Sequence, residues 1–95
     1  MKYFAWDGGK NELLKQKRGV SFEGVVFHIE NGDVLDIVEH PNAVRYRHQK
    51  VYIVNLDGYA YMVPFIESEE TVFLKTIIPS RKMTREYLYD QEDKT

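Results

Sequence analysis

The chain of 95 residues contains no cysteine, so disulfides and thiolate-bound metal ions are excluded, and nothing points to an oxidising compartment. It also lacks any apolar run close to the roughly 20 residues that a membrane-spanning helix needs. Met1-Lys2-Tyr3-Phe4 leads into Asp7 rather than into the apolar centre of a signal peptide. We therefore expect a cytoplasmic protein with no membrane contact.

Repeats, linkers and low-complexity stretches are missing as well, and proline occurs only three times. This length leaves room for one hydrophobic core, and a hydrophobic content of 43% is enough to build it. The sequence therefore predicts a single domain over residues 1–95, in which residues 90–95 form a solvated tail.

The sequence also carries little sign of a metal or cofactor site. Its histidines lie eight or more residues apart, without an HxxxH or HExxH spacing. We expect His28 to pack on a helix, and His40, which precedes Pro41, to support a turn. The Gly8-Gly9 pair lacks the rest of a P-loop. We therefore expect no cofactor and no metal ion.

The charges that are present alternate along the chain. The net charge of −2 argues against a nonspecific nucleic-acid coat. However, basic segments at residues 10–18, 45–50 and 75–85 alternate with acidic segments at 23–39, 57–70 and 86–94. If the fold gathers the basic segments, they form a cationic patch that attracts phosphate locally. Alternatively, the charges are scattered over a solvated surface.

Capping signals predict two helices at the start of the chain. Asp7 is a suitable N-cap for a helix that runs through Lys17, and Gly19 suits the left-handed position that ends it. Ser21 is a suitable N-cap for a second helix, which Asn31-Gly32-Asp33 stops.

Strand patterns follow at Val34–Glu39, Lys50–Leu56, Tyr59–Ile66 and Thr71–Ile78, with Asp57-Gly58 as a two-residue type I′ hairpin turn. Either Ser80 or Thr84 can cap a final helix, and we prefer Thr84 because Glu86 then lies in the first turn. The predicted fold class is α+β: two N-terminal helices, a four-stranded antiparallel sheet and a C-terminal helix.

Several cations occupy positions suited to phosphate binding. Arg81 and Lys82 directly follow a predicted strand, and the guanidinium of Arg81 can bind two phosphate oxygens at once. Alternatively, Arg81 pairs with Glu86 or Glu39.

Two further regions carry cations. Lys10 and Lys17 lie seven residues apart and therefore on the same side of the first helix, which equally describes an ordinary solvated face. The loop at residues 42–49 interleaves cations with Tyr46 and His48, which suits contacts to phosphates and bases, although an exposed connector explains it too. His48 is the natural candidate for proton transfer.

Motifs at both ends of the chain resemble those of the BrnT toxins. They are Phe4-Ala5-Trp6-Asp7 with Lys10-Asn11, then Lys17-Arg18-Gly19-Val20-Ser21-Phe22, and finally Ile77-Ile78-Pro79-Ser80-Arg81-Lys82-Met83-Thr84-Arg85-Glu86. The resemblance implies a RelE-like fold and a bacterial endoribonuclease that acts on messenger RNA. It also implies a cognate antitoxin, usually of the ribbon-helix-helix type, through which the toxin reaches operator DNA.

The chain departs from the family pattern at two places. Arg18 stands where the family usually has a histidine. Arg47-His48-Gln49-Lys50 lacks the acid that usually precedes the second strand, so that Lys50 or Arg47 replaces the family arginine. The arginine of the closing motif is kept as Arg81.

These observations suggest metal-independent RNA cleavage by the 2′-hydroxyl. Arg81 is the first choice for stabilising the phosphate charge, helped by Lys10 and by Arg47 or Lys50. His48 would move a proton, with Tyr46 or Tyr87 as substitutes or stacking surfaces. The expected RNA-binding residues are Lys17, Arg18, Tyr46, Lys50, Lys82, Arg85 and Tyr87.

The alternative function is that of a non-catalytic toxin relic, which binds the antitoxin and acts as a co-repressor. In that case Trp6 could anchor the antitoxin, although tryptophan also suits the core. The two functions differ in one structural expectation, because only a nuclease needs Arg81, His48 and the lysines of the first helix to converge. A stand-alone DNA-binding protein is less well supported, because no predicted helix has a basic, base-reading face.

Overall fold

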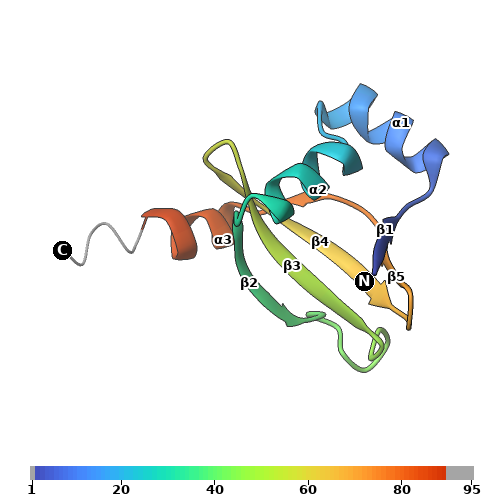
Figure 1. Ribbon diagram of the computed structural model, residues 1–95. Coiled ribbons are helices and arrows are strands. Elements are labelled where there is room, and N and C mark those ends of the chain that lie inside the picture. The colour runs from blue at the N-terminus through green and yellow to red at the C-terminus, as the bar shows by residue number, and fades with distance from the viewer. Residues whose placement is uncertain (1, 90–95) are drawn as a thin grey trace.

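The computed structural model describes residues 2–89 as an α+β fold, in which helices pack on a mixed sheet (Figure 1). The predicted tail at residues 90–95 lies outside the described residues. The elements in chain order are β1 (Tyr3–Ala5), α1 (Gly8–Arg18), α2 (Phe22–Glu30), β2 (Val34–Glu39), β3 (Gln49–Leu56), β4 (Tyr59–Glu67), β5 (Thr71–Leu74), β6 (Ile78–Pro79), α3 (Arg81–Thr84) and the π-helical turn η1 (Arg85–Tyr89).

Both N-terminal helices have the predicted caps. The carboxylate of Asp7 accepts a hydrogen bond from the backbone N–H of Lys10 at 3.0 Å, and Gly19 adopts a φ of 68° after the last turn of α1. The hydroxyl of Ser21 accepts from the N–H of Gly24 at 3.0 Å. These contacts satisfy backbone groups that the helices leave unpaired, and they fix where α1 and α2 begin and end.

Asn11 joins the two helices. It is buried, and its side-chain oxygen accepts from the backbone N–H of Phe22 at 2.8 Å, while its Nδ2 donates to Glu23 Oε1 at 2.7 Å. Trp6 is half-buried and stacks on Phe22 with ring centroids 5.8 Å apart. The motif residues Trp6 and Asn11 therefore hold the fold together in this structure, and Trp6 belongs to the core.

The sheet has more strands than the sequence predicts. Its order is β1-β5-β4-β3-β2, with β6 added beside β4. The prediction of four antiparallel strands is wrong in two respects. First, Tyr3–Ala5 forms an additional strand that is parallel to β5. Second, the predicted strand Thr71–Ile78 is divided into β5 and β6, because Ile77 turns inward and is fully buried in the core.

The Asp57-Gly58 turn is confirmed. Asp57 and Gly58 have φ values of 55° and 95°, as both central residues of a type I′ turn require. Asn55 Oδ1 also accepts from the N–H of Gly58 at 2.7 Å. The turn fixes the register between β3 and β4, which runs from Leu56↔Tyr59 to Gln49↔Ile66.

Pro64 lies inside β4, at a place where the neighbouring strand is interrupted. On that side of β4, β5 pairs with residues 65–67 and β6 pairs with residues 61–62, which leaves residues 63 and 64 between the two ladders. The carbonyl of Pro64 accepts from the N–H of Lys75 at 2.8 Å. The missing N–H of proline therefore costs no ladder bond there.

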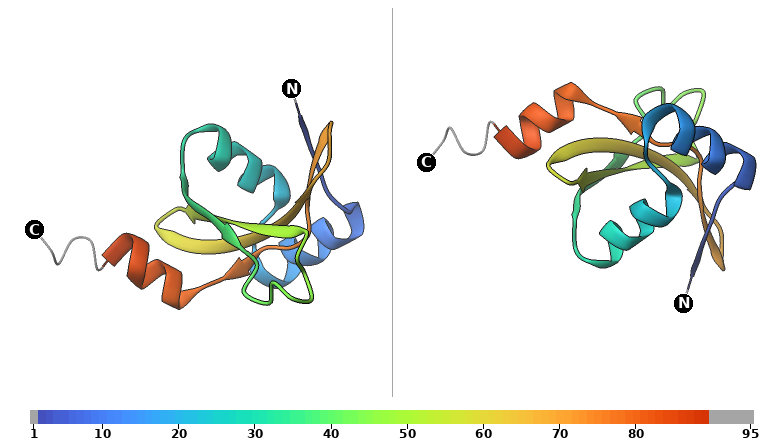
Figure 2. Two further views of the ribbon diagram at one scale, coloured as in Figure 1. Left: turned by 90° about the horizontal axis from the view of Figure 1, so that it is seen from below. Right: turned by 90° about the horizontal axis from the view of Figure 1, so that it is seen from above.

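Helices cover both faces of the sheet (Figure 2). Helices α1 and α2 lie on one face, over the larger core of Leu14, Phe22, Val25, Val54, Val63, Phe65, Val72, Leu74 and Ile77. Helix α3 and η1 lie on the other face, over a smaller core of Val51, Ile53 and Ala60 with Met83, Tyr87 and Leu88.

The final helix begins at Ser80, and the preference for Thr84 as its cap is wrong. The Ser80 hydroxyl accepts from the N–H of Met83 at 3.1 Å. Thr84 is buried inside the helix, where its hydroxyl accepts from the N–H of Ala60 at 2.8 Å and donates to the carbonyl of Ser80 at 2.7 Å. This tie to β4 outweighs the small gain of placing Glu86 in the first turn of a helix.

Candidate functional site

Six of the predicted site residues line two separate hollows of the surface. One has a volume of about 250 Å³ and is lined by Arg47, His48, Lys50, Phe65 and Glu67; we call it the His48 hollow. The other has a volume of about 430 Å³ and is lined by Arg81, Lys82, Arg85 and Glu86; we call it the Arg81 hollow. The single concavity expected for Arg81 and His48 is therefore not formed.

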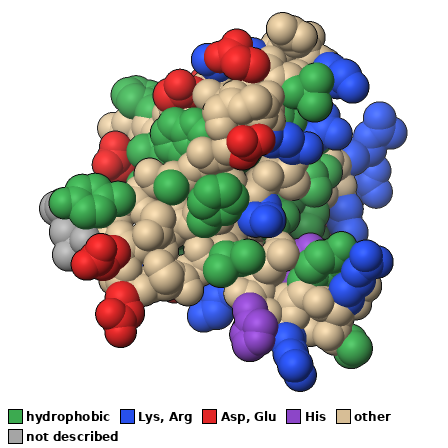
Figure 3. Space-filling view, turned by 90° about the vertical axis from the view of Figure 1, so that its right-hand side faces the viewer, with side chains coloured by type: hydrophobic (Ala, Val, Ile, Leu, Met, Phe, Trp, Pro, Cys, Tyr) green, Lys and Arg blue, Asp and Glu red, His purple; other side chains and the backbone are tan. Residues whose placement is uncertain are grey.

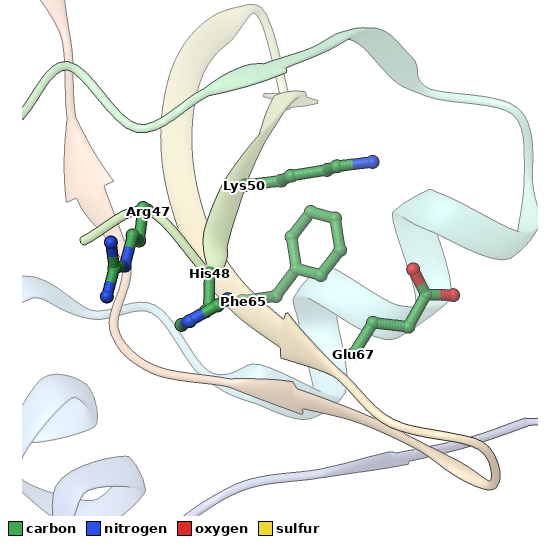
Figure 4. Close-up of a pocket in the computed structure, with 5 residues that line it drawn as sticks. All are labelled: Arg47, His48, Lys50, Phe65 and Glu67. Atoms are coloured by element: carbon green, nitrogen blue, oxygen red, sulfur yellow. The ribbon is translucent and has the colours of Figure 1, made fainter. Parts of the chain in front are cut away.

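The His48 hollow lies at the open end of the β3–β4 hairpin. The hairpin register places Lys50 opposite Phe65, whose ring is 3% exposed and stacks on Tyr52 at 4.1 Å. Figure 4 shows this ring between the side chains of Lys50 and Glu67, while Arg47 and His48 extend to the opposite side. The floor of the hollow is thus apolar and rigid, and its walls carry charge.

Glu67 gives the His48 hollow an acid that the sequence analysis missed. Lys2 Nζ donates to Glu67 Oε2 at 2.6 Å. This hydrogen bond, the charge of Lys2 and the nearby charge of Lys50 hold the pKa of Glu67 below its ordinary value of 4.5. Glu67 is therefore a carboxylate at neutral pH.

The sequence contained a signal for Phe65 and Glu67. Because the turn has two residues, each step away from Leu56 on β3 is matched by one step away from Tyr59 on β4, as far as Gln49↔Ile66. One step beyond the ladder, His48 comes opposite Glu67. A register count from Asp57-Gly58 would have found both residues.

The Arg81 hollow is lined almost entirely by cations. Arg81 and Lys82 come from the start of α3, and Arg85 comes from the start of η1. Within residues 2–89, Arg81 forms no ion pair with Glu86 or Glu39, so the alternative pairing is not observed. The hollow offers several positive charges to a polyanion and no histidine for proton transfer.

The cations of α1 line neither hollow. Arg18 donates from Nη1 to the backbone carbonyl of Ile77, and this bond ties the end of α1 to the segment between β5 and β6. Lys10 and Lys17 contribute to neither cavity. In Figure 1, α1 lies at the top of the molecule and the loop between β2 and β3 at the bottom.

One side of the molecule is nevertheless richer in cations. Figure 3 shows Lys and Arg side chains mainly along one side of the face in view. Asp and Glu side chains lie mainly along the other side. On this face of the molecule, the positive and negative charges are thus partly separated.

The two tyrosines proposed for RNA contact are engaged elsewhere. The Tyr46 ring lies 4.4 Å from the His40 ring, and the Arg45 guanidinium lies 5.4 Å from its centroid. The Tyr87 hydroxyl donates to Asp36 Oδ2 at 2.6 Å, and this hydrogen bond, with partial desolvation, raises the pKa of Tyr87. Tyr87 therefore serves to pack the C-terminal helix against β2.

His28 and His40 have the structural roles expected of them. His28 Nδ1 lies 2.8 Å from Asp33 Oδ2, and His40 Nδ1 accepts from the N–H of Asn42 at 3.0 Å. Within residues 2–89 there is no cluster of three or more side chains suited to hold a metal ion.

Neither models of protein families, nor curated proteins, nor solved structures match this chain. No helix in the described part of the chain is both long and apolar enough to cross a membrane. The functional assignment therefore depends on the motifs of the sequence and on the geometry of the two hollows.

Proposed function

We propose that the protein is the toxin of a bacterial type II toxin–antitoxin pair and cleaves messenger RNA, without a metal ion, at the His48 hollow. The observation that carries the proposal is the composition of this hollow. It combines an imidazole with two cations, Arg47 and Lys50, over a buried aromatic floor. The motifs shared with the BrnT toxins support the same function.

The reaction requires attack by the 2′-hydroxyl on its own phosphorus, protonation of the leaving 5′-oxygen and stabilisation of the charge on the phosphate oxygens. Arg47 and Lys50 supply the positive charge, and neither forms an ion pair within residues 2–89. His48, in its protonated form, gives its proton to the leaving 5′-oxygen. The expected convergence of Arg81, His48 and Lys10 is not observed, so a nuclease centred on Arg81 is given up. The proposed reaction places the main stabilising charge on Arg47 instead.

In this proposal the Arg81 hollow binds the RNA strand outside the reaction centre. The two hollows lie near opposite ends of β4. Phe65, near the end of β4, lines the His48 hollow. The Arg81 hollow lies on α3, which follows β6, and β6 pairs with Tyr61 and Met62 near the start of β4. Three cations without a proton donor are suited to bind phosphates along a single strand.

The test is an RNA cleavage assay with purified protein in excess chelator. We expect cleavage that leaves a 2′,3′-cyclic phosphate and a 5′-hydroxyl. Arg47→Ala should lower the rate by about 100-fold, as the loss of one preorganised charge does. Arg45→Ala is the matched control, because Arg45 lies in the same loop but lines neither hollow. Intact RNA after incubation with the wild-type protein would contradict the proposal.

A second candidate function, the non-catalytic antitoxin-binding relic, is favoured by two observations. Arg81, His48 and Lys10 do not converge. Phe27 on α2 is also 62% exposed, and it offers an apolar contact for a partner. Co-expression with the neighbouring reading frame distinguishes the two functions. A relic would form a complex with the antitoxin and repress its operator, but the protein freed from that complex would leave RNA intact.

A further inference from the structure

We infer that Glu67 is the general base of the proposed RNA cleavage, with Lys2 as the residue that positions it. This inference rests on the proposed function and extends it to residues outside the BrnT-like motifs. Within residues 2–89, Glu67 is the only acid that lines the His48 hollow. The reaction needs a group that removes the 2′-proton, and the imidazole that donates to the leaving group cannot accept it in the same step.

The positions of Glu67 and His48 suit an in-line displacement. The attacking 2′-oxygen and the leaving 5′-oxygen lie on opposite sides of the phosphorus, so the base and the acid must lie on opposite sides of the bound phosphate. Figure 4 shows Glu67 and His48 extending toward opposite sides of the hollow. Lys50 comes from the neighbouring strand opposite Phe65 and extends to the same side as Glu67, with the Phe65 ring between them.

One oxygen of the Glu67 carboxylate is open to a substrate. Its Oε2 takes the hydrogen bond from Lys2 Nζ, and its Oε1 receives no hydrogen bond from residues 2–89. Because nearby Lys2 and Lys50 favour the charged form, Glu67 is ionised over the whole neutral range. One oxygen is thus fixed in place, and the other is available to the substrate.

The N-terminal strand explains how Lys2 reaches this site. Strand β1 pairs in parallel with β5, with Tyr3 opposite Thr71, and the N–H of Tyr3 donates to the carbonyl of Glu70 at 2.8 Å. This pairing brings Lys2 to the turn between β4 and β5, where β4 ends at Glu67. The short strand that the sequence did not predict therefore has a function at the site.

The proposed step is balanced in atoms and charge. The 2′-hydroxyl proton passes to Glu67 Oε1 while the bond between the 2′-oxygen and phosphorus forms. The bond between phosphorus and the 5′-oxygen breaks, and the leaving oxygen takes a proton from the imidazolium of His48. The products are a 2′,3′-cyclic phosphate and a 5′-hydroxyl, and proton exchange with water restores Glu67 and His48.

The test compares Glu67→Gln with Glu69→Gln in cleavage of a short RNA of defined sequence over a range of pH. Glu67→Gln should lower the rate by about 100-fold to 10,000-fold, as the loss of a general base does. Glu69→Gln, an exposed control in the neighbouring turn, should retain the wild-type rate. Removal of the Lys2–Glu67 pair should cost little stability, since both side chains are partly exposed, at 39% and 45%.

The pH profile distinguishes a base from a residue that only supports the fold. The wild-type rate should fall as the pH drops through the lowered pKa of Glu67, below 4.5, because the carboxylate then takes up a proton. Lys2→Met should move this acidic limb to higher pH, because it removes the main cause of the lowered pKa. The remaining cleavage rate of Glu67→Gln should not show this fall at acidic pH.

The possible failures are distinct. Wild-type protein that cleaves RNA while Glu67→Gln does so equally well overturns the assignment of Glu67 and leaves the proposed function standing. An acidic limb that Lys2→Met does not move overturns the positioning role of Lys2. Wild-type protein that cleaves no RNA at any pH overturns the proposed function and this inference together.

Discussion

The two hollows differ in what surrounds their cations. The His48 hollow mixes positive charge with an imidazole and a carboxylate, and it is built on a hairpin whose register is fixed by a tight turn. The Arg81 hollow holds three cations beside one acid, on a helix of four residues that continues as a π-helical turn. Proton transfer requires groups of the first kind, whereas strand binding requires only charge. In the proposed function, the His48 hollow therefore carries out the chemistry and the Arg81 hollow supplies affinity for RNA.

The strongest test of this division is His48→Ala. We expect kcat for RNA cleavage to fall by about 100-fold to 10,000-fold, because the leaving oxygen loses its proton donor. The affinity for RNA should remain close to that of the wild type, since the cations remain. Single-turnover kinetics and binding by fluorescence anisotropy measure the two quantities separately. A drop in affinity without a drop in kcat would reverse the roles of the hollows.

The second test removes the charges of the Arg81 hollow in the triple variant Arg81→Ala, Lys82→Ala and Arg85→Ala. RNA affinity should fall, and the slope of log K against log salt should shrink by about 0.7 for each phosphate that the variant no longer neutralises. The cleavage rate of fully bound RNA should be retained. A salt titration of binding checks the slope, and an unchanged slope would show that this hollow does not meet phosphate.

A smaller effect is expected where the Arg81 hollow is attached to the sheet. Thr84→Val removes the acceptor for the buried N–H of Ala60 and should lower the free energy of unfolding by about 1–3 kcal/mol. Thr84→Ser keeps the hydroxyl and serves as the control. Denaturant unfolding measures both variants, and equal stability of Thr84→Val and the wild type would show that this tie is not needed.

The smallest effect concerns the Tyr87–Asp36 hydrogen bond. Because the folded state raises the pKa of Tyr87 above its ordinary value of 10.0, the bond stabilises the protein below that pH. The contribution is lost as the pH rises through the raised pKa, since the folded state then holds a proton that the unfolded state has released. Thermal unfolding from about pH 8 to 11 should therefore show a shallower alkaline decline for Tyr87→Phe than for the wild type.

Local signals in the sequence predicted the two N-terminal helices and the hairpin well. Asp7, Gly19 and Ser21 act through contacts a few residues away, and the Asp57-Gly58 turn needs no partner beyond its own strands. Strands that depend on distant partners were missed. Tyr3–Ala5 has three residues and becomes a strand only because β5 lies beside it, and Ile77 interrupts the last strand because the core takes it up.

The sequence named three of the five residues that line the His48 hollow, but not their arrangement. Arg47, His48 and Lys50 are neighbours in the sequence, so they line one hollow. Arg81 was expected there too, but its position depends on the sheet face that α3 covers. Two tertiary contacts with Ala60 of β4 decide this: the Thr84 hydroxyl accepts from the Ala60 N–H, and the Ser80 N–H donates to the Ala60 carbonyl. Glu67 was missed because a carboxylate between Ile66 and Ser68 carries no motif, and only the strand register gives it meaning.

The two-residue turn at Asp57-Gly58 has a consequence for how this protein can change. Side chains alternate between the faces of a strand, so a change in the turn that shifted the β3–β4 pairing by one residue would exchange the faces of β4 relative to β3. Phe65 and Glu67 would leave Lys50 and face α3, and Ile66 would take their place. Such a shift of register would erase the proposed chemistry while every proposed catalytic residue was still present in the chain.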